Sequence, residues 1–368
     1  MPAMTASELY LYAIVPSGDQ VLFDIAGVGN DSGEVYTIPY HPADSSARPL
    51  AAVVSPSPIP DYHGLKRPEA AAYLIAHQRV VELVMRGFST LPVKFGTVMK
   101  DKDQVLRMLA QGQAGLLHAL DKYGSKVQME LVVLWNIEYV FQKISQDERI
   151  QAAKAQVVAS PAEDSLAKKV ALGKLVQAIL EEQRAALAND ILPYLQEIAG
   201  EIIANPLMND GMVLNLALLL DEDGTHKLDR TLETLDALFE ARGYTGGASL
   251  VFRRVGPLPP YSFTTIEIQS LNFEVVDNAR KLLELQETTT IKEIQHAYHR
   301  QVIRQHPDLH PEQLESDDGI TRLTQAYRLL SNYAESQYKM TPDVCSLDRE
   351  SVSQAILISV QRPDSIPA

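Results

Sequence analysis

The residues whose type and spacing come nearest to a reactive site are histidines in the C-terminal fifth of the chain. His296 and His299 are three positions apart, and His306 and His310 are four apart. Side chains at these spacings lie on one face of a helix, where two imidazoles can share a zinc ion. Pro307 interrupts any helix between the second pair, and no cysteine or acidic cluster completes either site. We therefore expect no bound metal and no other cofactor.

Two further groups lack the surroundings that ligand binding or catalysis needs. The run Asp221-Glu222-Asp223-Gly224 has the composition of a calcium loop without its ligand spacing or closing glutamate, which favours a hairpin or a strand-to-helix turn. Cys345, the only cysteine, has no histidine near it in sequence that would activate a thiolate. The chain contains neither a GxxxxGKS/T loop nor a GxGxxG fingerprint. The sequence therefore predicts a protein that is not an enzyme.

Composition narrows the class of protein further. Of the 368 residues, 46% are hydrophobic and 22% charged, the balance of a globular protein with two or three domains. The net charge of −14 argues against nucleic-acid binding, because phosphate binding needs a basic surface. The sequence has no run of about 18 apolar residues that would span a membrane, and no basic signal-peptide segment at its N-terminus. A single cysteine fits a reducing compartment, so we expect a cytoplasmic protein.

The tripeptide His306-Pro307-Asp308 lies between two helical patterns. Thr290 and Glu293 have the spacing of a capping box, which predicts a helix that begins directly after the threonine. The proline disfavours helical geometry at the residue before it, so this helix should end there. A polar loop at 309–319 and a second helix at 320–330 follow. We expect the two helices to pack through Ile294, Ala297, Tyr298, Val302 and Ile303 of the first and Ile320, Leu323, Ala326, Tyr327 and Leu330 of the second.

This module, at 271–340, resembles the J-domain family, in which two antiparallel helices present a His-Pro-Asp loop to a DnaK-type chaperone. The resemblance implies that His306-Pro307-Asp308 engages the ATPase side of the chaperone. It also implies that Arg300 and Arg304 meet the chaperone's acidic surface. Residues 291–305 contain three cations and one anion, so the first helix is positive within an acidic chain. A cationic helix steers an acidic partner towards it and sets the docking orientation, and contributes less to affinity.

The module departs from the family pattern at several positions. Leu309 stands where family members often have lysine, and Gln295 and His296 replace commonly basic residues. The tyrosine that is usual in the first helix of the family is missing. An alternative interpretation is therefore an inert J-like hairpin that only caps the neighbouring domain. The positions that match the family are Leu283, Leu285, Glu293, Ile294, Ala297, Tyr298, Ile320, Leu323, Ala326, Tyr327, Leu330 and Ser331.

The rest of the chain alternates strand and helix patterns, which predicts two α+β domains at 1–150 and 151–270. In the first we expect strands at 9–15, 35–38, 50–55, 90–98 and 129–135, and helices at 68–85 and 103–120. In the second we expect helices at 160–203 and 230–239, and strands at 212–220, 249–255 and 261–268, as in half of a ferredoxin-like unit. A tail at 341–368 includes a possible edge strand at 355–360. The predicted fold is α+β: two α+β domains, the second ferredoxin-like, followed by a small all-helical J-domain-like hairpin.

Four segments of the body, the part of the chain that precedes the helical module, carry a second resemblance. They are YLYAIV at 10–15, HQRVVELVMRGFSTLPVKFGTV at 77–98, LVVLW at 131–135 and VFRRVGPLPPYSF at 251–263. Over residues 8–268 the chain resembles the gas vesicle protein F/L (GvpF/GvpL) family. The resemblance implies two α+β domains, the second a modified ferredoxin-like fold, and a non-enzymatic role in gas vesicle assembly alongside other gas vesicle proteins.

The family implies a particular partner, the small and very apolar gas vesicle shell protein. A subunit with an exposed apolar strand edge aggregates until it pairs with a neighbour. A protein that covers this edge would limit aggregation during vesicle nucleation, and the J-like module would bring a DnaK-type ATPase to the shell subunit. The alternative is a minor structural component of the vesicle with an inert hairpin. The sequence assigns no residues to the shell contact.

One charge stands out within the second body segment. Lys94 lies between Val93 and Phe95, inside an apolar motif, and therefore needs either solvent or a partner. Gly96 follows and is expected at a tight backbone position. We expect the remaining residues of the motif to pack a core.

Overall fold

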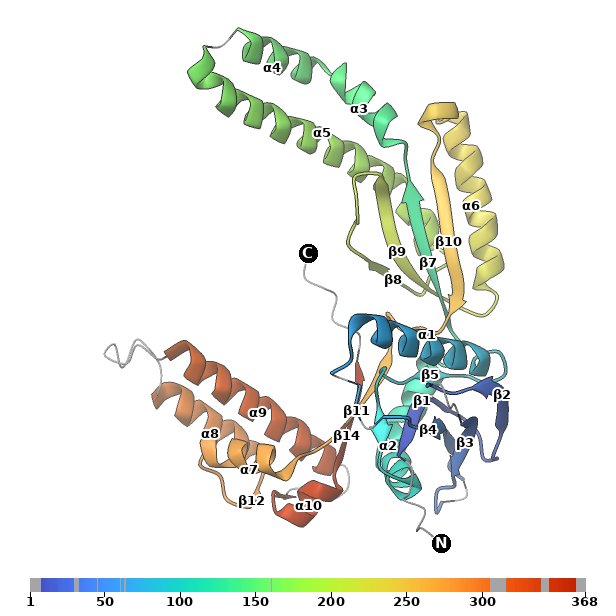
Figure 1. The fold of residues 1–368 in the computed structure, drawn as a ribbon, viewed down its shortest axis with the longest axis vertical. Helices are drawn as coiled ribbons and strands as arrows, with labels where there is room; N and C mark the ends of the chain where they lie inside the picture. The colour runs from blue at the N-terminus through green and yellow to red at the C-terminus, as the bar shows by residue number, and fades with distance from the viewer. Residues whose placement is uncertain are drawn as a thin grey trace. The chain divides into compact units, whose positions relative to one another are not determined.

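The computed structural model consists of two compact units, each built from both helices and strands (Figure 1). The first unit runs to Leu120 and also includes Thr265–Gln361, and the second is Asp121–Thr264. The predicted α+β class is confirmed. The structure describes residues 8–29, 33–44, 46–59, 61–62, 64–159, 161–304, 316–338 and 344–361.

The first unit has a sheet in the order β2-β3-β4-β1-β5, with β6 also paired to β1. Strand β1 lies in the interior of the sheet, between β4 and β5. Its sequence, LYLYAIV, is apolar or aromatic throughout, and all of its residues are buried. The strands expected at 9–15, 35–38 and 50–55 are confirmed. Strand β2 was not predicted, since it is an edge strand whose side chains are alternately exposed and half-buried. The bounds are β1 Leu9–Val15, β2 Leu22–Ala26, β3 Glu34–Tyr40, β4 Leu50–Pro56, β5 Leu91–Pro92 and β6 Val98–Met99.

The first unit also contains helices α1 (Arg67–Val84) and α2 (Lys102–Tyr123), close to the expected ranges. Helix α1 begins with a proline in its first turn, where the missing N–H costs nothing. It packs against β1 and β2 and buries His77, Val80, Val81 and Val84. The histidine among these apolar residues is not explained by helical periodicity alone.

The helical module is inserted between two paired strands. Strands β11 (Thr265–Ser270) and β14 (Ile356–Gln361) are antiparallel, and Ser270 lies directly opposite Ile356. A parallel bridge between Val93 and Ile266 joins β11 to the segment after β5. The chain therefore leaves the body at β11 and returns to it at β14. The edge strand expected at 355–360 is confirmed, and it secures the second end of the module.

In its described residues, the inserted module contains three principal helices and three short elements. Helices α8 and α9 pack against each other, and α7 packs against α9 (Figure 1). Strands β12 and β13 pair in an antiparallel ladder. The bounds are α7 Phe273–Leu282, β12 Thr288–Thr289, α8 Ile291–Arg304, α9 Ser316–Tyr338, β13 Cys345–Ser346 and α10 Arg349–Gln354.

The second unit has a four-stranded antiparallel sheet in the order β10-β7-β9-β8. The sequence places β7 in the first domain, but here it pairs on both sides, with β9 and β10. Its apolar stretch matches these distant strands in register, and no local pattern reveals that pairing. The bounds are β7 Val127–Leu134, β8 Glu201–Ala204, β9 Met212–Leu220 and β10 Val251–Leu258.

Helices connect these strands so that the elements follow the order β-α-β-β-α-β, which ferredoxin-like units share. The first connection contains three helices, and α4 packs beside the long α5 (Figure 1). Apolar residues of α5, α6 and the sheet share one core. The bounds are α3 Ile137–Ser145, α4 Glu148–Val158, α5 Ala162–Gln196, α6 Gly224–Ala241 and a 3₁₀ turn η1 Gly246–Ala248.

Candidate functional site

The candidate site is the outer face of α8, and a capping box fixes where this helix begins. The Thr290 N–H donates to Glu293 Oε2 at 2.8 Å, and the Glu293 N–H donates to Thr290 Oγ1 at 3.1 Å. Each side chain thereby satisfies a backbone donor of the first turn, as the sequence predicts. The first turn of α8 is thus defined by local sequence.

The inner face of α8 packs on α9, largely as the apolar pattern predicts. Ile294 and Ala297 are fully buried, and the Tyr298 ring stacks on Tyr327 at a centroid distance of 4.5 Å. The expectation for Ile303 was wrong, because its side chain is 61% exposed. Gln301 is buried in its place, since it lies four residues after Ala297 on the same helical face. Leu323, Ala326, Leu330, Tyr333 and Ala334 supply the α9 side of this core.

The outer face of α8 is polar and carries the predicted cations. Arg300 and Arg304 are both exposed. An open pocket of about 600 Å³ lies against this face, and Glu284 and Glu293 contribute negative charge to it. Arg304 Nη1 lies 3.3 Å from the Glu284 carboxylate, with both side chains largely exposed, so this pair contributes little stability. His296, His299, Arg300 and Ile303 line the α8 side of the pocket.

The tripeptide His306-Pro307-Asp308 lies outside the described residues, as do Leu309 and His310. Helix α8 is described to Arg304 and α9 from Ser316, so the two helices that flank the tripeptide are in place. The assignment of the tripeptide and of Arg300 and Arg304 to chaperone binding stays a prediction.

The other candidate groups have structural roles. Cys345 is buried, and its burial raises the thiol pKa to about 12, so the thiolate needed for nucleophilic attack is not populated near neutral pH. The acidic run after β9 forms a strand-to-helix turn, with Asp221 and Asp223 paired to Lys126 and Lys227. Within the described ranges, no group of three or more histidine, cysteine or acidic side chains is arranged to hold a metal ion.

Lys94 is both exposed to solvent and paired with a carboxylate, the two environments that the sequence allows for a charge inside an apolar motif. Its ammonium lies 2.7 Å from Glu267 Oε1 of β11, and its side chain is 58% exposed. The hydrogen bond from Lys94 holds the pKa of Glu267 below its ordinary value. The Lys94 N–H also donates to the Ile266 carbonyl at 2.9 Å. This residue therefore helps to attach β11, the strand that leads into the helical module. Gly96 has a φ of 84°, as a tight position requires.

Sequence reasoning missed an aromatic cluster around His77 in the first unit. The His77 ring lies 5.7 Å from both Tyr10 and Tyr12 and 5.9 Å from Phe95, measured between ring centroids. His77 Nδ1 lies 3.0 Å from the Tyr10 hydroxyl. Burial lowers the pKa of His77 to about 4, so the ring is neutral at physiological pH. The only signal in the sequence is a histidine on the apolar face of a helix.

Two known protein families match this chain, one over its N-terminal part and one over the helical module. The family described as gas vesicle synthesis protein GvpL/GvpF matches residues 8–265. The chain belongs to the GvpL/GvpF family. A DnaJ domain matches residues 279–338, which span α8, α9 and the end of α7. The GvpL/GvpF chain therefore carries a DnaJ domain, and its role is associated with gas vesicles.

Individual relatives agree with this assignment. Gas vesicle protein F of a Streptomyces species is 28% identical over 214 residues, which are 58% of this chain and 84% of the relative. Gas vesicle protein F of a Nostoc species is 24% identical and covers 71% of this chain and 99% of its own length.

Solved structures share the fold over 70% of this chain. The crystal structure of GvpF from Anabaena sp. PCC7120 has a TM-score of 0.55 at 23% identity and covers 70% of this chain and 98% of that chain. GvpF from Microcystis aeruginosa has a TM-score of 0.51 at 21% identity, with the same coverage. None of the helices described in this chain combines the length and the apolar character that a membrane crossing requires.

Proposed function

We propose that this GvpL/GvpF chain is a non-enzymatic assembly factor that holds the apolar gas vesicle shell subunit and delivers it to a DnaK-type chaperone. The observation that carries the proposal is the position of the DnaJ domain between β11 and β14, two paired strands of the body. A domain attached at both ends keeps a recruited ATPase close to whatever the body binds. A high effective concentration of this kind needs no additional contact.

Among the described residues, β2 of the first unit is an edge strand to which such a subunit could add. Strand β2 ends the sheet order of the first unit, and Leu22 on it is 61% exposed. An apolar strand edge of a shell subunit would add to β2 through main-chain hydrogen bonds, with its own edge covered in return. Leu22 contributes apolar area without belonging to the core, so it can be changed without unfolding the sheet.

The shell contact is tested by light scattering of the purified shell protein in the presence of the full chain. We expect the wild type to delay aggregation and Leu22→Lys to weaken this effect, because a lysine on an edge strand opposes strand addition. Leu74→Lys is the matched control, since Leu74 is also exposed but lies on α1. Equal protection by all three proteins would reject β2 as the contact. No protection by the wild type would reject the holding role.

The chaperone contact is tested by single-turnover ATP hydrolysis of a DnaK-type chaperone. Asp308→Asn and Arg300→Ala should reduce stimulation while leaving protection of the shell protein unchanged. Arg328→Ala serves as the control, because Arg328 is exposed on α9 rather than on the α8 face. Wild-type stimulation by Asp308→Asn would favour the alternative, a structural vesicle component with an inert hairpin.

A further inference from the structure

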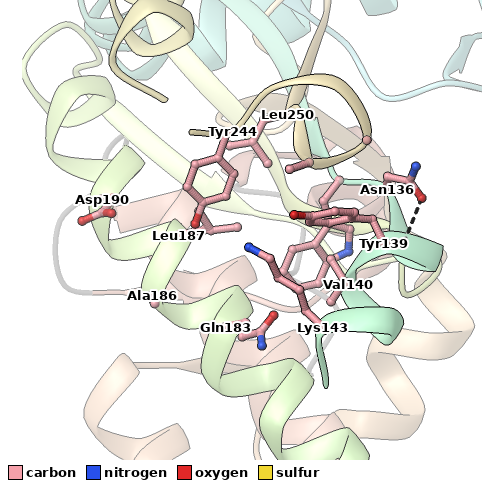
Figure 2. Close-up of a pocket in the computed structure, with 13 residues that line it drawn as sticks. Asn136, Tyr139, Val140, Lys143, Gln183, Ala186, Leu187, Asp190, Tyr244 and Leu250 are labelled. Atoms are coloured by element: carbon pink, nitrogen blue, oxygen red, sulfur yellow. Dashed lines mark hydrogen bonds between the residues drawn. The ribbon is translucent and has the colours of Figure 1, made fainter. Parts of the chain in front are cut away.

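The second unit contains a pocket of about 230 Å³ between α3, α5 and the segment that joins α6 to β10 (Figure 2). The rings of Tyr139 and Tyr244 line it from two different elements. This volume lies below the range of roughly 300–1,000 Å³ that is typical of small-molecule sites, so it suits a single large side chain. The floor is buried and apolar, and consists of Trp135, Val140, Leu187 and Leu250.

Contacts behind the pocket fix the positions of Trp135 in its floor and of Tyr244 in its wall. The Trp135 indole N–H donates to the Asp210 carbonyl at 2.6 Å. The buried Arg184 guanidinium lies 5.6 Å from the Trp135 ring centroid, and its Nε donates to the Met212 carbonyl at 2.9 Å. Tyr244 packs edge-on against Phe239, with centroids 5.3 Å apart. A ligand therefore meets a preformed surface and loses little free energy in ordering it.

Among the described residues, one charge at the rim of the pocket has no opposite partner. Asp190 lies at the rim, but Arg242 Nη1 neutralises it at 2.7 Å. Lys143 Nζ lies 5.1 Å from the Tyr139 ring centroid and makes no ion pair with a carboxylate of the described chain. Figure 2 shows this ammonium directed into the space between Tyr139 and Leu187. The rim is thus positive above an aromatic and aliphatic floor.

We propose that this pocket binds a protein partner through one aromatic side chain that stands next to a carboxylate. An aromatic ring fills the volume and packs edge or face against the two tyrosines. A carboxylate beside it reaches Lys143 and forms a charge-assisted hydrogen bond. Anchors of this kind carry much of the binding energy of protein interfaces. The pocket belongs to the second unit, whereas α8 belongs to the first.

Trp135 is the only tryptophan of the chain, so its fluorescence reports occupancy directly. The probes are N-acetylphenylalanine, which has a free carboxylate, and N-acetylphenylalanine amide, which does not. We expect a saturable change with both, and binding of the acid about threefold tighter, as one exposed ion pair gives. N-acetylglycine should give no saturable change, because it lacks the ring.

Variants then separate the two parts of the site in the full-length chain. Lys143→Gln should abolish the preference for the acid, whereas Lys174→Gln, an exposed lysine of α5 outside the pocket, should keep it. Ala186→Phe places a ring in the mouth of the pocket and should abolish saturable binding of both probes. The proposal is overturned if acid and amide bind the wild type equally, if neither saturates, or if Ala186→Phe binds like the wild type.

Discussion

Protonation of His77 should make the first unit lose stability as the pH falls below neutral. The histidine is buried among aromatic rings, and its pKa in the folded state is lowered from 6.5 to about 4. The unfolded chain therefore binds a proton near pH 6.5, whereas the folded chain binds it only near pH 4. Because the unfolded state carries more protons in this window, stability is complete above the upper value and falls towards the lower one.

The magnitude follows from the difference of 2.5 between the two pKa values, 6.5 and about 4. At about 1.36 kcal/mol for each pKa unit, the loss of unfolding free energy across the window is about 3 kcal/mol. No allowance for solvent screening is needed, since the side chain is only 1% exposed. The first unit should thus lose a large share of a typical domain stability of about 5–15 kcal/mol.

Urea unfolding at several pH values between 7 and 4.5 measures this loss, with near-ultraviolet tyrosine absorbance as the signal because Tyr10, Tyr12 and Tyr62 belong to the cluster. His77→Gln is the matched variant: it retains a hydrogen-bond acceptor for Tyr10 but does not titrate. Carboxylates affect both proteins alike, so the difference in pH dependence isolates the histidine. Parallel pH profiles for the wild type and His77→Gln would refute the reasoning.

Three further outcomes test the helical module. Leu330→Ala should lower the unfolding free energy of the first unit by about 2–5 kcal/mol, because Leu330 is fully buried, whereas exposed Ile303→Ala should change it by less than about 0.5 kcal/mol in the same urea titration. Thr290→Ala should lower the stability of the start of α8 by about 1 kcal/mol, which amide hydrogen exchange in its first turn would show as a faster rate. Unchanged exchange there would contradict the capping box. Cys345 should react slowly with iodoacetamide at pH 8 in the folded protein and quickly in denaturant, because its thiol pKa is raised to about 12; rapid alkylation of the folded protein would count against the buried thiol.

Local features of the site could be predicted from the sequence because their determinants are neighbours in the chain. Thr290 and Glu293 define the start of α8 within a single turn, and the repeat of apolar residues identifies the α8–α9 interface. The same pattern failed at Ile303, since a polar Gln301 occupies the buried position of the last turn. Periodicity identifies a face, and the partner packed against it decides which side chain is enclosed.

Long-range features could not be predicted, because their partners are distant in sequence. β7 resembles a strand of either domain until its pairing with β9 and β10 is known. The segment 341–368 is expected to be a C-terminal tail, but its strand β14 pairs with β11 and so attaches the second end of the DnaJ domain. The cluster around His77 likewise draws residues from β1, α1 and the segment after β5. In each case the controlling contact is tertiary.

The structure suggests a variant that separates the two proposed activities. Ser270 and Ile356 are opposite each other in the β11–β14 ladder, so an Asn-Gly turn can replace residues 271–355 and close the ribbon as a hairpin. The body then keeps both strands, which a simple truncation after residue 270 would not achieve.

The decisive measurement is the ATP-dependent release of bound shell subunit in the presence of a DnaK-type chaperone, compared between the full chain and this closed variant. The account predicts that both proteins keep the shell subunit dispersed and that only the full chain releases it when ATP is added. Equal release from the two proteins, or no release from either, would contradict a division of labour between the GvpL/GvpF body and its inserted DnaJ domain.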